Sequence, residues 1–141
     1  MILFDTDHVT ILRMPPSDRR NRLVERIDLT PRELFVVPIV AIEETMRGWL
    51  AAIAKERLAR RQVSGYRELS RLFQFFTSFP IAPFDDPAAD RFDALKAAKV
   101  RIASRDLKIA AITLAANGLL LTANRRDFEN VPGLKFENWL D

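Results

Sequence analysis

The sequence contains no cysteine and only one histidine, His8, among its 141 residues. Without cysteine there is no disulfide framework, no thiolate zinc site and no cysteine nucleophile. A single histidine also argues against a metal site built from several histidines. Any metal would therefore be held by oxygen ligands, which favours magnesium or manganese over zinc.

Long apolar runs are also missing. No stretch approaches the roughly 20 residues of a membrane-spanning helix, and the first residues lack the basic start of a signal peptide. We therefore expect a cytoplasmic protein that has no membrane partner. Hydrophobic residues make up 48% and charged residues 29%, as in ordinary globular proteins. The length fits one domain, residues 1–141.

Positive charge exceeds negative charge by three, and much of it lies in arginine clusters such as residues 19–22, 57–61 and 125–126. Clustered arginines attract phosphates whatever the nucleotide sequence, so the balance is compatible with a polyanionic partner. Arginine clusters on helices are also common as plain solvated surface. The charge alone identifies no partner.

Short apolar runs alternate with amphipathic segments along the chain. The apolar runs predict strands, and the amphipathic segments predict helices, one of them capped by Thr6 or Asp7 and another by Ser104. This alternation predicts an α/β fold, a three-layer α/β/α sandwich with a mainly parallel central sheet. The expected strands are residues 1–4, 33–38, 80–84 and 119–122, with an edge strand at 134–136. The expected helices are residues 8–12, 18–27, 39–60, 63–79 and 105–117, together with one that begins at residue 85. Residues 124–128 are expected to form a loop or short turn.

Acidic side chains fall at several of the expected strand–helix junctions. Each of them alone also fits a plain structural role, because an acid in a first helical turn is favoured by the helix dipole. As a set they are unusual, since these junctions lie on one edge of a parallel sheet and like charges there repel unless a cation compensates. The set is Asp5 and Asp7, Glu43 and Glu44, Asp106, and Asp127 with Asn124.

These motifs, over essentially the whole length, resemble a PIN-domain ribonuclease of the VapC toxin type. Residues 3–8, Leu-Phe-Asp-Thr-Asp-His, resemble the family's first motif, and residues 39–48 resemble the second. In the second motif the functional glutamate precedes a glycine by four residues, which selects Glu44 over Glu43. Residues 102–111 resemble the third motif, with Ala103 where the family usually has glycine. Residues 120–128, followed by 131–134 and Trp139, resemble the closing segment.

The resemblance implies a magnesium-dependent endoribonuclease that is the toxin of a toxin–antitoxin pair. Asp5, Glu44 and Asp106 are then the catalytic residues and the ligands of Mg²⁺ or Mn²⁺, with Asp127 or Asn124 completing the site. Glu44 is expected to orient or deprotonate the attacking water. The implied partners are an RNA substrate, a cognate antitoxin protein and a second copy in a homodimer. Supporting residues are expected at Thr6, Asp7, Ser104 and Thr122, and RNA phosphate contacts at Arg47, Arg125 and Arg126.

Two alternatives remain at this point. Residues 5–9, Asp-Thr-Asp-His-Val, also fit the opening motif of a haloacid-dehalogenase-like phosphatase, in which Asp5 would be the nucleophile. The chain is short for that fold, and its later motifs are hard to find. The second alternative is a PIN-like module that binds RNA or protein without cutting, because Asn124 brings no charge. His8 is expected to pack or cap a helix rather than act as a base.

Overall fold

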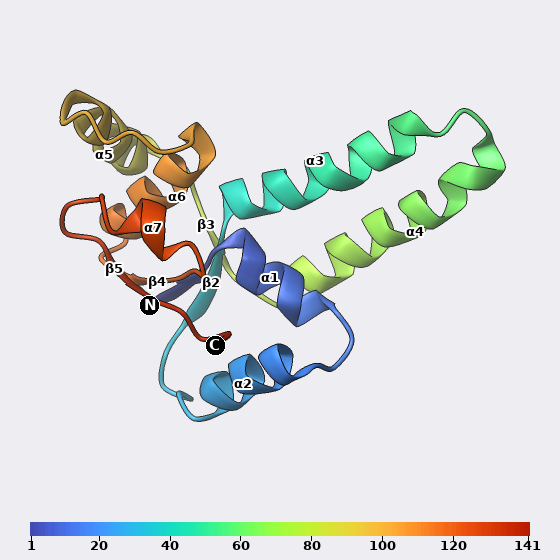
Figure 1. The fold of residues 1–141 in the computed structure, drawn as a ribbon, viewed down its shortest axis with the longest axis horizontal. Coiled ribbons are helices and arrows are strands. Elements are labelled where there is room, and N and C mark those ends of the chain that lie inside the picture. The colour runs from blue at the N-terminus through green and yellow to red at the C-terminus, as the bar shows by residue number, and fades with distance from the viewer.

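Five short parallel strands form the centre of the computed structural model, which describes residues 1–141 (Figure 1). Their order across the sheet is β3-β2-β1-β4-β5, so β1 lies in the middle. The predicted α/β class with a parallel sheet is confirmed. The strands are β1 (Ile2–Phe4), β2 (Phe35–Pro38), β3 (Ile81–Ala82), β4 (Leu119–Leu121) and β5 (Lys135–Glu137).

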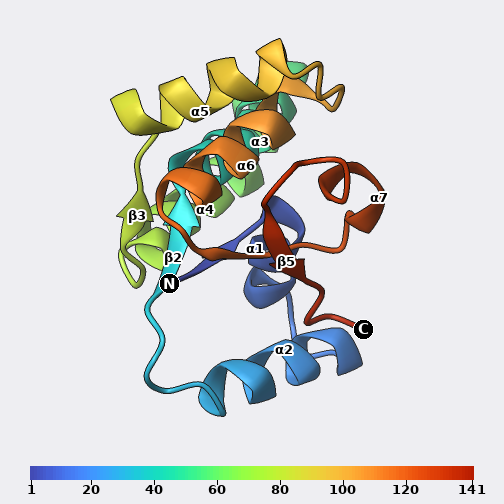
Figure 2. The ribbon, with the colours of Figure 1, turned by 90° about the vertical axis from the view of Figure 1, so that its left-hand side faces the viewer.

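Seven helices cover the two faces of the sheet and make the three predicted layers (Figure 2). Side chains alternate along each strand, so Leu3 packs toward α5 and α6 whereas Ile2 and Phe4 pack toward α1, α2 and α4. Helix α3 contributes to both cores. The helices are α1 (Thr6–Arg13), α2 (Asp18–Asp28), α3 (Ile39–Lys55), α4 (Ala59–Phe76), α5 (Asp86–Ala97), α6 (Ser104–Ala115) and α7 (Arg125–Phe128).

Helices α3 and α4 form an antiparallel hairpin that projects from the rest of the molecule (Figure 1). The sequence predicts one helix over residues 39–60, but α3 ends at Lys55, and α4 begins at Ala59 rather than residue 63. The two helices approach closely at Gly65, where an added Cβ would lie 2.6 Å from Ile53 Cγ1. None of the helices combines the length and apolar composition that crossing a bilayer requires.

Two predicted helix caps are wrong. Asp5, rather than Thr6 or Asp7, is the N-cap of α1, and its carboxylate accepts a hydrogen bond from the Thr6 amide. Ser104 is the first residue of α6 and not its cap; the N-cap is Ala103, which has no capping side chain. Residues 125–128, expected as a loop or short turn, form the single-turn helix α7, capped by Asn124.

His8 joins helix α1 to the C-terminal segment. The side chain is fully buried, and its Nε2 accepts a hydrogen bond from the Trp139 amide at 3.2 Å. A neutral imidazole that accepts at Nε2 carries its proton on Nδ1, which lies 2.9 Å from Asp7 Oδ1. The prediction that His8 is a packing residue is therefore confirmed.

Two glycines of the hairpin should respond oppositely to alanine. Gly65→Ala forces the new methyl against Ile53 and should lower the free energy of unfolding by about 1–3 kcal/mol. At Gly48 an added Cβ meets nothing within 4 Å, so Gly48→Ala should raise the same quantity by about 0.5–1 kcal/mol through helix propensity. Urea denaturation measures both. Equal changes in the two variants would contradict the close approach of α3 and α4.

Candidate active site

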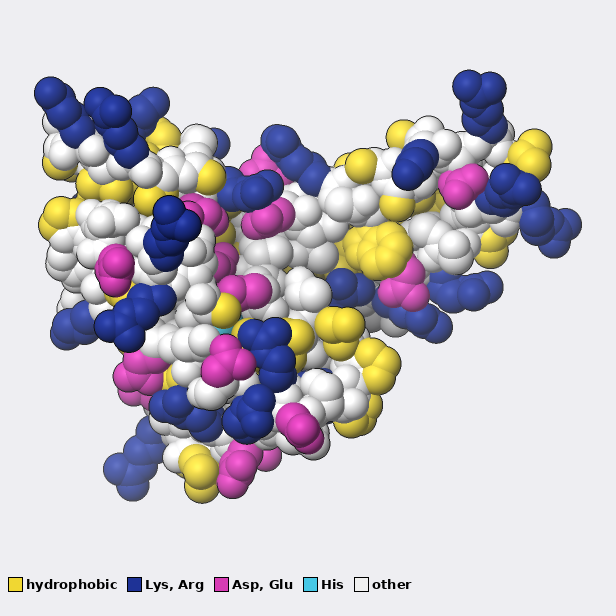
Figure 3. All heavy atoms as spheres, viewed as in Figure 1, with side chains coloured by type: hydrophobic (Ala, Val, Ile, Leu, Met, Phe, Trp, Pro, Cys, Tyr) yellow, Lys and Arg dark blue, Asp and Glu magenta, His cyan; other side chains and the backbone are white.

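The predicted acidic residues meet at the carboxyl edge of the sheet. A cavity of about 460 Å³ lies there, where β1 leads into α1 and where α3 and α6 begin. In Figure 3 acidic side chains gather in the middle of this face, with Lys and Arg side chains beside them. Among the residues lining the cavity are Asp5, Thr6, Asp7, Glu44, Asp106 and Asn124.

Asp5 lies at the inner end of this cavity, and only 6% of its surface is exposed. One carboxylate oxygen accepts from the Thr6 amide, and the other accepts from the Thr122 hydroxyl at 2.7 Å. Burial, together with repulsion from Asp7, raises the pKa of the Asp5 carboxyl to about 7, and the two hydrogen bonds only partly offset this rise. The site thus holds a carboxylate whose charge is destabilised in the absence of a cation.

Glu44 is held at both carboxylate oxygens. The Thr6 hydroxyl donates to Oε2 at 2.5 Å, and Arg105 Nε lies 3.1 Å from Oε1. Glu43 does not line the acidic cavity and instead forms an ion pair with Arg47 at 2.8 Å. The structure therefore places Glu44, and not Glu43, on the wall of this cavity.

Asp106 lines the same cavity from the first turn of α6. Burial and the neighbouring Glu44 raise the pKa of the Asp106 carboxyl, although Arg105 opposes the rise; Asp127 and Asp7 add to it. The acids are therefore close enough to influence one another electrostatically.

Asn124 and Asp127 occupy different places at the fourth acidic position. Asn124 lines the cavity, whereas Asp127 does not, and the Asn124 amide donates to Asp127 Oδ2 at 3.0 Å. The Asn124 backbone amide also donates to the Thr122 hydroxyl at 3.0 Å. Asp127 thus orients Asn124, and Thr122 connects Asn124 to Asp5.

Asp7 is held by hydrogen bonds on the side of α1. Its Oδ1 accepts from His8, and its Oδ2 accepts from the Ala123 amide at 3.0 Å. Burial tends to raise the pKa of the Asp7 carboxyl, but these hydrogen bonds outweigh it and the pKa is lowered. Asp7 therefore stays ionised and joins α1 to the segment after β4.

The donor set fits a hard divalent cation. The lining residues offer carboxylate and amide oxygens, which Mg²⁺ and Mn²⁺ prefer, and the raised pKa values of Asp5 and Asp106 indicate uncompensated negative charge. No three Asp, Glu or His side chains are gathered tightly enough to coordinate one ion as they stand. Glu44 is instead neutralised by Arg105.

Ser104 and several arginines lie around the acidic cavity or beside it. Ser104 makes no side-chain hydrogen bond and, with Arg47, lines a neighbouring cavity. Arg125 and Arg126 are exposed on α7 and line neither cavity. Arg19 and Arg105 also line the acidic cavity; in the sequence, Arg19 stood out only as part of a basic cluster, and no role was expected for Arg105. The only signal for Arg105 was its position next to Asp106.

The family model described as PIN domain matches residues 4–134. None of the curated proteins compared with this chain matches it.

Solved structures share the fold over nearly the whole chain. VapBC-1 from nontypeable Haemophilus influenzae is 19% identical, with a TM-score of 0.74 and all of both chains covered. VapBC2 from Rickettsia felis, bound to a DNA fragment from its promoter, is 21% identical, with a TM-score of 0.70 and 99% of each chain covered. A toxin-antitoxin complex from Klebsiella pneumoniae is 21% identical, with a TM-score of 0.68 and 95% of each chain covered.

The raised pKa of Asp5 should make metal-free stability fall with rising pH. The unfolded carboxyl loses its proton near pH 4, whereas the folded carboxyl keeps it to about pH 7. The unfolded chain thus binds fewer protons in this window, and the free energy of unfolding falls by up to about 1.4 kcal/mol per pH unit.

Urea denaturation in a chelator, at several values between pH 4 and pH 7.5, measures this slope. Asp5→Asn should flatten it, leaving the smaller contribution of Asp106, whose raised pKa acts in the same direction. Adding Mg²⁺ to the unmodified protein should reduce the slope, because the cation stabilises the ionised form. Equal slopes for Asp5→Asn and the unmodified protein would contradict the assignment.

Proposed function

This chain belongs to the PIN-domain family, and from that premise we propose that it is a metal-dependent endoribonuclease and the toxin of a toxin–antitoxin pair. The observation that carries the proposal is the meeting of Asp5, Glu44 and Asp106 in one cavity at the carboxyl edge of the sheet. Three carboxylates from three separate elements share that cavity. Such a set is suited to divalent cations and, through them, to phosphodiester hydrolysis.

Asp5, Glu44 and Asp106 would hold one or two Mg²⁺ or Mn²⁺ ions, with Asn124 at the rim. When bound, the metal lowers the pKa of water and stabilises charge on the phosphoryl oxygens. Thr122 fixes the direction of the Asp5 carboxylate, and Thr6 fixes that of Glu44. Glu44 has the longest of the three acidic side chains, and we assign to it the orientation and deprotonation of the attacking water.

The proposed partners follow from the same premise. The similar solved structures include a toxin-antitoxin complex and two VapBC structures. We propose that a small antitoxin covers the acidic cavity of this chain, and that the chain forms a homodimer.

The haloacid-dehalogenase alternative loses its support. The family model that matches residues 4–134 is the PIN domain. The non-cleaving alternative keeps one observation in its favour, the neutral Asn124 in the cavity, and the cleavage experiment decides it.

Asp5→Asn should abolish Mg²⁺-dependent cleavage of single-stranded RNA while leaving the fold intact, because the amide cannot supply the charge that a metal ligand needs. The matched control is Asp90→Asn, at an exposed acid of α5. Cleavage is measured on purified protein with and without Mg²⁺, and 5′ ends are sequenced after induced expression.

Full cleavage by Asp5→Asn would overturn the assignment of Asp5. RNA retention without any Mg²⁺-dependent product would instead favour the binding module. Cleavage of a DNA strand of the same sequence, without cleavage of the RNA, would overturn the proposal that RNA is the substrate.

Thr122→Val should weaken Mn²⁺ binding by about 10- to 100-fold, because it removes the hydrogen bond that orients a ligating carboxylate. Thr113→Val is the control: this buried threonine of α6 donates only to the Ile109 carbonyl of its own helix. Isothermal titration calorimetry with Mn²⁺ measures both variants. Equal Mn²⁺ affinities for the two would show that Thr122 does not orient Asp5.

A further inference from the structure

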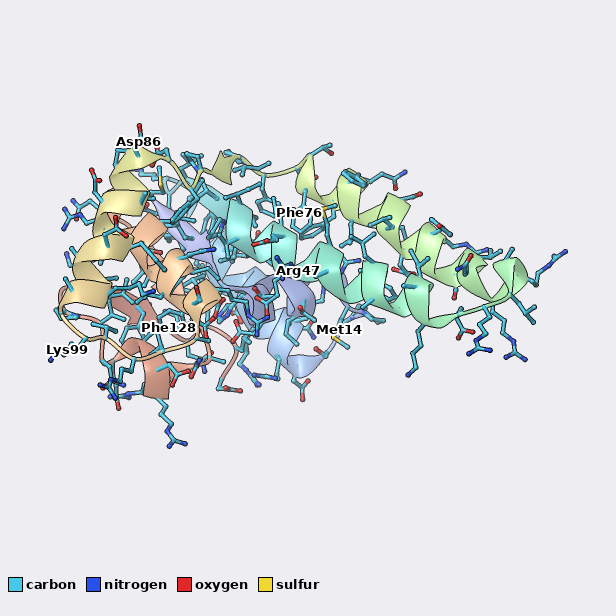
Figure 4. All side chains as sticks on the ribbon, turned by 90° about the horizontal axis from the view of Figure 1, so that it is seen from above. Met14, Arg47, Phe76, Asp86, Lys99 and Phe128 are labelled. Carbon is cyan, nitrogen blue, oxygen red and sulfur yellow. The ribbon has the colours of Figure 1, made fainter.

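A second cavity adjoins the acidic one. It has a volume of about 330 Å³ and lies between α3 and the start of α6. Glu44 and Arg105 line both cavities, so the two share a wall. Figure 4 shows Arg47 on α3, near the middle of the molecule. The remaining lining residues are Glu43, Arg47, Ala103, Ser104 and Lys108.

The second cavity differs from the first in charge, because three of its seven lining residues are cations. Arg47 is paired with Glu43, and Arg105 is paired with Glu44. Lys108 has no carboxylate partner, and its Nζ lies 5.9 Å from the centroid of the Phe84 ring. The cavity therefore holds one cation with no counter-ion inside the protein.

The two ion pairs of this cavity are exchangeable. The Arg47 and Arg105 side chains are 75% and 57% exposed, and exposed pairs contribute only about 0–1 kcal/mol. Arg105 binds Glu44 where a metal would also bind. A divalent cation that took up the charge of Glu44 would leave Arg105 free to pair with another anion.

Ser104 supplies further donors on the same wall. It is the first residue of α6, a helix of 12 residues whose N-cap has no capping side chain. The first amides of α6 and the Ser104 hydroxyl therefore lack side-chain partners beside Lys108, one turn along the same helix. Amide and hydroxyl donors next to cations are a combination that binds phosphate oxygens.

We propose that this second cavity binds the phosphodiester next to the one that is cleaved. Lys108 is its resident cation, and Arg105 moves from Glu44 to this phosphate once a metal neutralises Glu44. The inference rests on the proposed ribonuclease function, because a strand whose phosphate lies in the acidic cavity must continue past its wall. Arg105 then has two successive roles: it positions Glu44 before the metal binds, and it binds the substrate afterwards.

The metal part is tested by titrating Mn²⁺ into RNA-free protein. Arg105→Gln removes the cation that competes for Glu44, and it should raise Mn²⁺ affinity about two- to five-fold, the equivalent of an exposed ion pair. The control is Arg61→Gln, at an exposed arginine of α4 in the projecting hairpin. Unchanged or weaker Mn²⁺ binding by Arg105→Gln would overturn the exchange.

The phosphate part is tested by fluorescence anisotropy with a short single-stranded RNA, in the Asp5→Asn background to prevent cleavage. Lys108→Gln should weaken binding several-fold and reduce the slope of log affinity against log salt by about 0.7, the loss of one phosphate contact. Lys108→Arg should restore both, and Lys55→Gln, at the end of α3, should change neither. Circular dichroism checks that the Lys108 variants fold.

The outcomes separate this inference from the proposed function. Suppose that the protein cleaves RNA through Asp5 but that Lys108→Gln changes neither the RNA affinity nor the salt slope. This result would overturn only the proposal that the second cavity binds a phosphate. Loss of RNA binding on Lys108→Gln, in a protein that never cleaves RNA, would support the phosphate site and overturn the nuclease assignment.

Discussion

The burial of Asp5 at the end of the central strand is the constraint on which the rest of the structure depends. A carboxylate with 6% exposure has lost most of its hydration, and two other acids raise its pKa further. The surrounding elements offset part of this cost: the Thr122 hydroxyl from the end of β4 and the first amide of α1 both donate to it. The cost that is left appears as the raised pKa of Asp5, which either a proton or a nearby cation relieves.

The two acids of the Asp5-Thr6-Asp7 motif perform different tasks because their surroundings differ. Asp5 accepts two hydrogen bonds and keeps an elevated pKa, whereas Asp7 accepts from His8 and Ala123 and has a lowered one. Asp7 thereby connects α1 to the segment that follows β4, and His8 extends this connection to Trp139. Asp5 thus keeps a destabilised charge at the cavity, and Asp7 holds together the segments that form the cavity wall.

The sequence predicted the parallel sheet, the layers and the acids at one edge, because these depend on local apolar patterns and on the topology of alternating elements. It could not predict the end of α3 at Lys55, which coincides with a hairpin closed by the contact between Gly65 and Ile53. It also missed Arg105, since the partner of that side chain lies on α3, about 60 residues away in the chain. The sequence could not tell whether Asn124 or Asp127 lines the cavity, because the answer depends on how helix α7 orients the two side chains.

The site draws on segments near residues 5, 44, 106 and 122, and β1 pairs with β4 in the middle of the sheet. Domains fold as units during synthesis, and the contact of Thr122 with Asp5 joins residues 117 positions apart. A ribosome-bound chain that has not yet exposed β4 therefore lacks the hydroxyl that orients Asp5, the carbonyls that pair β1 and the Trp139 amide that binds His8. The carboxylate centre is therefore complete only once β4 and the segment that follows it have left the ribosome.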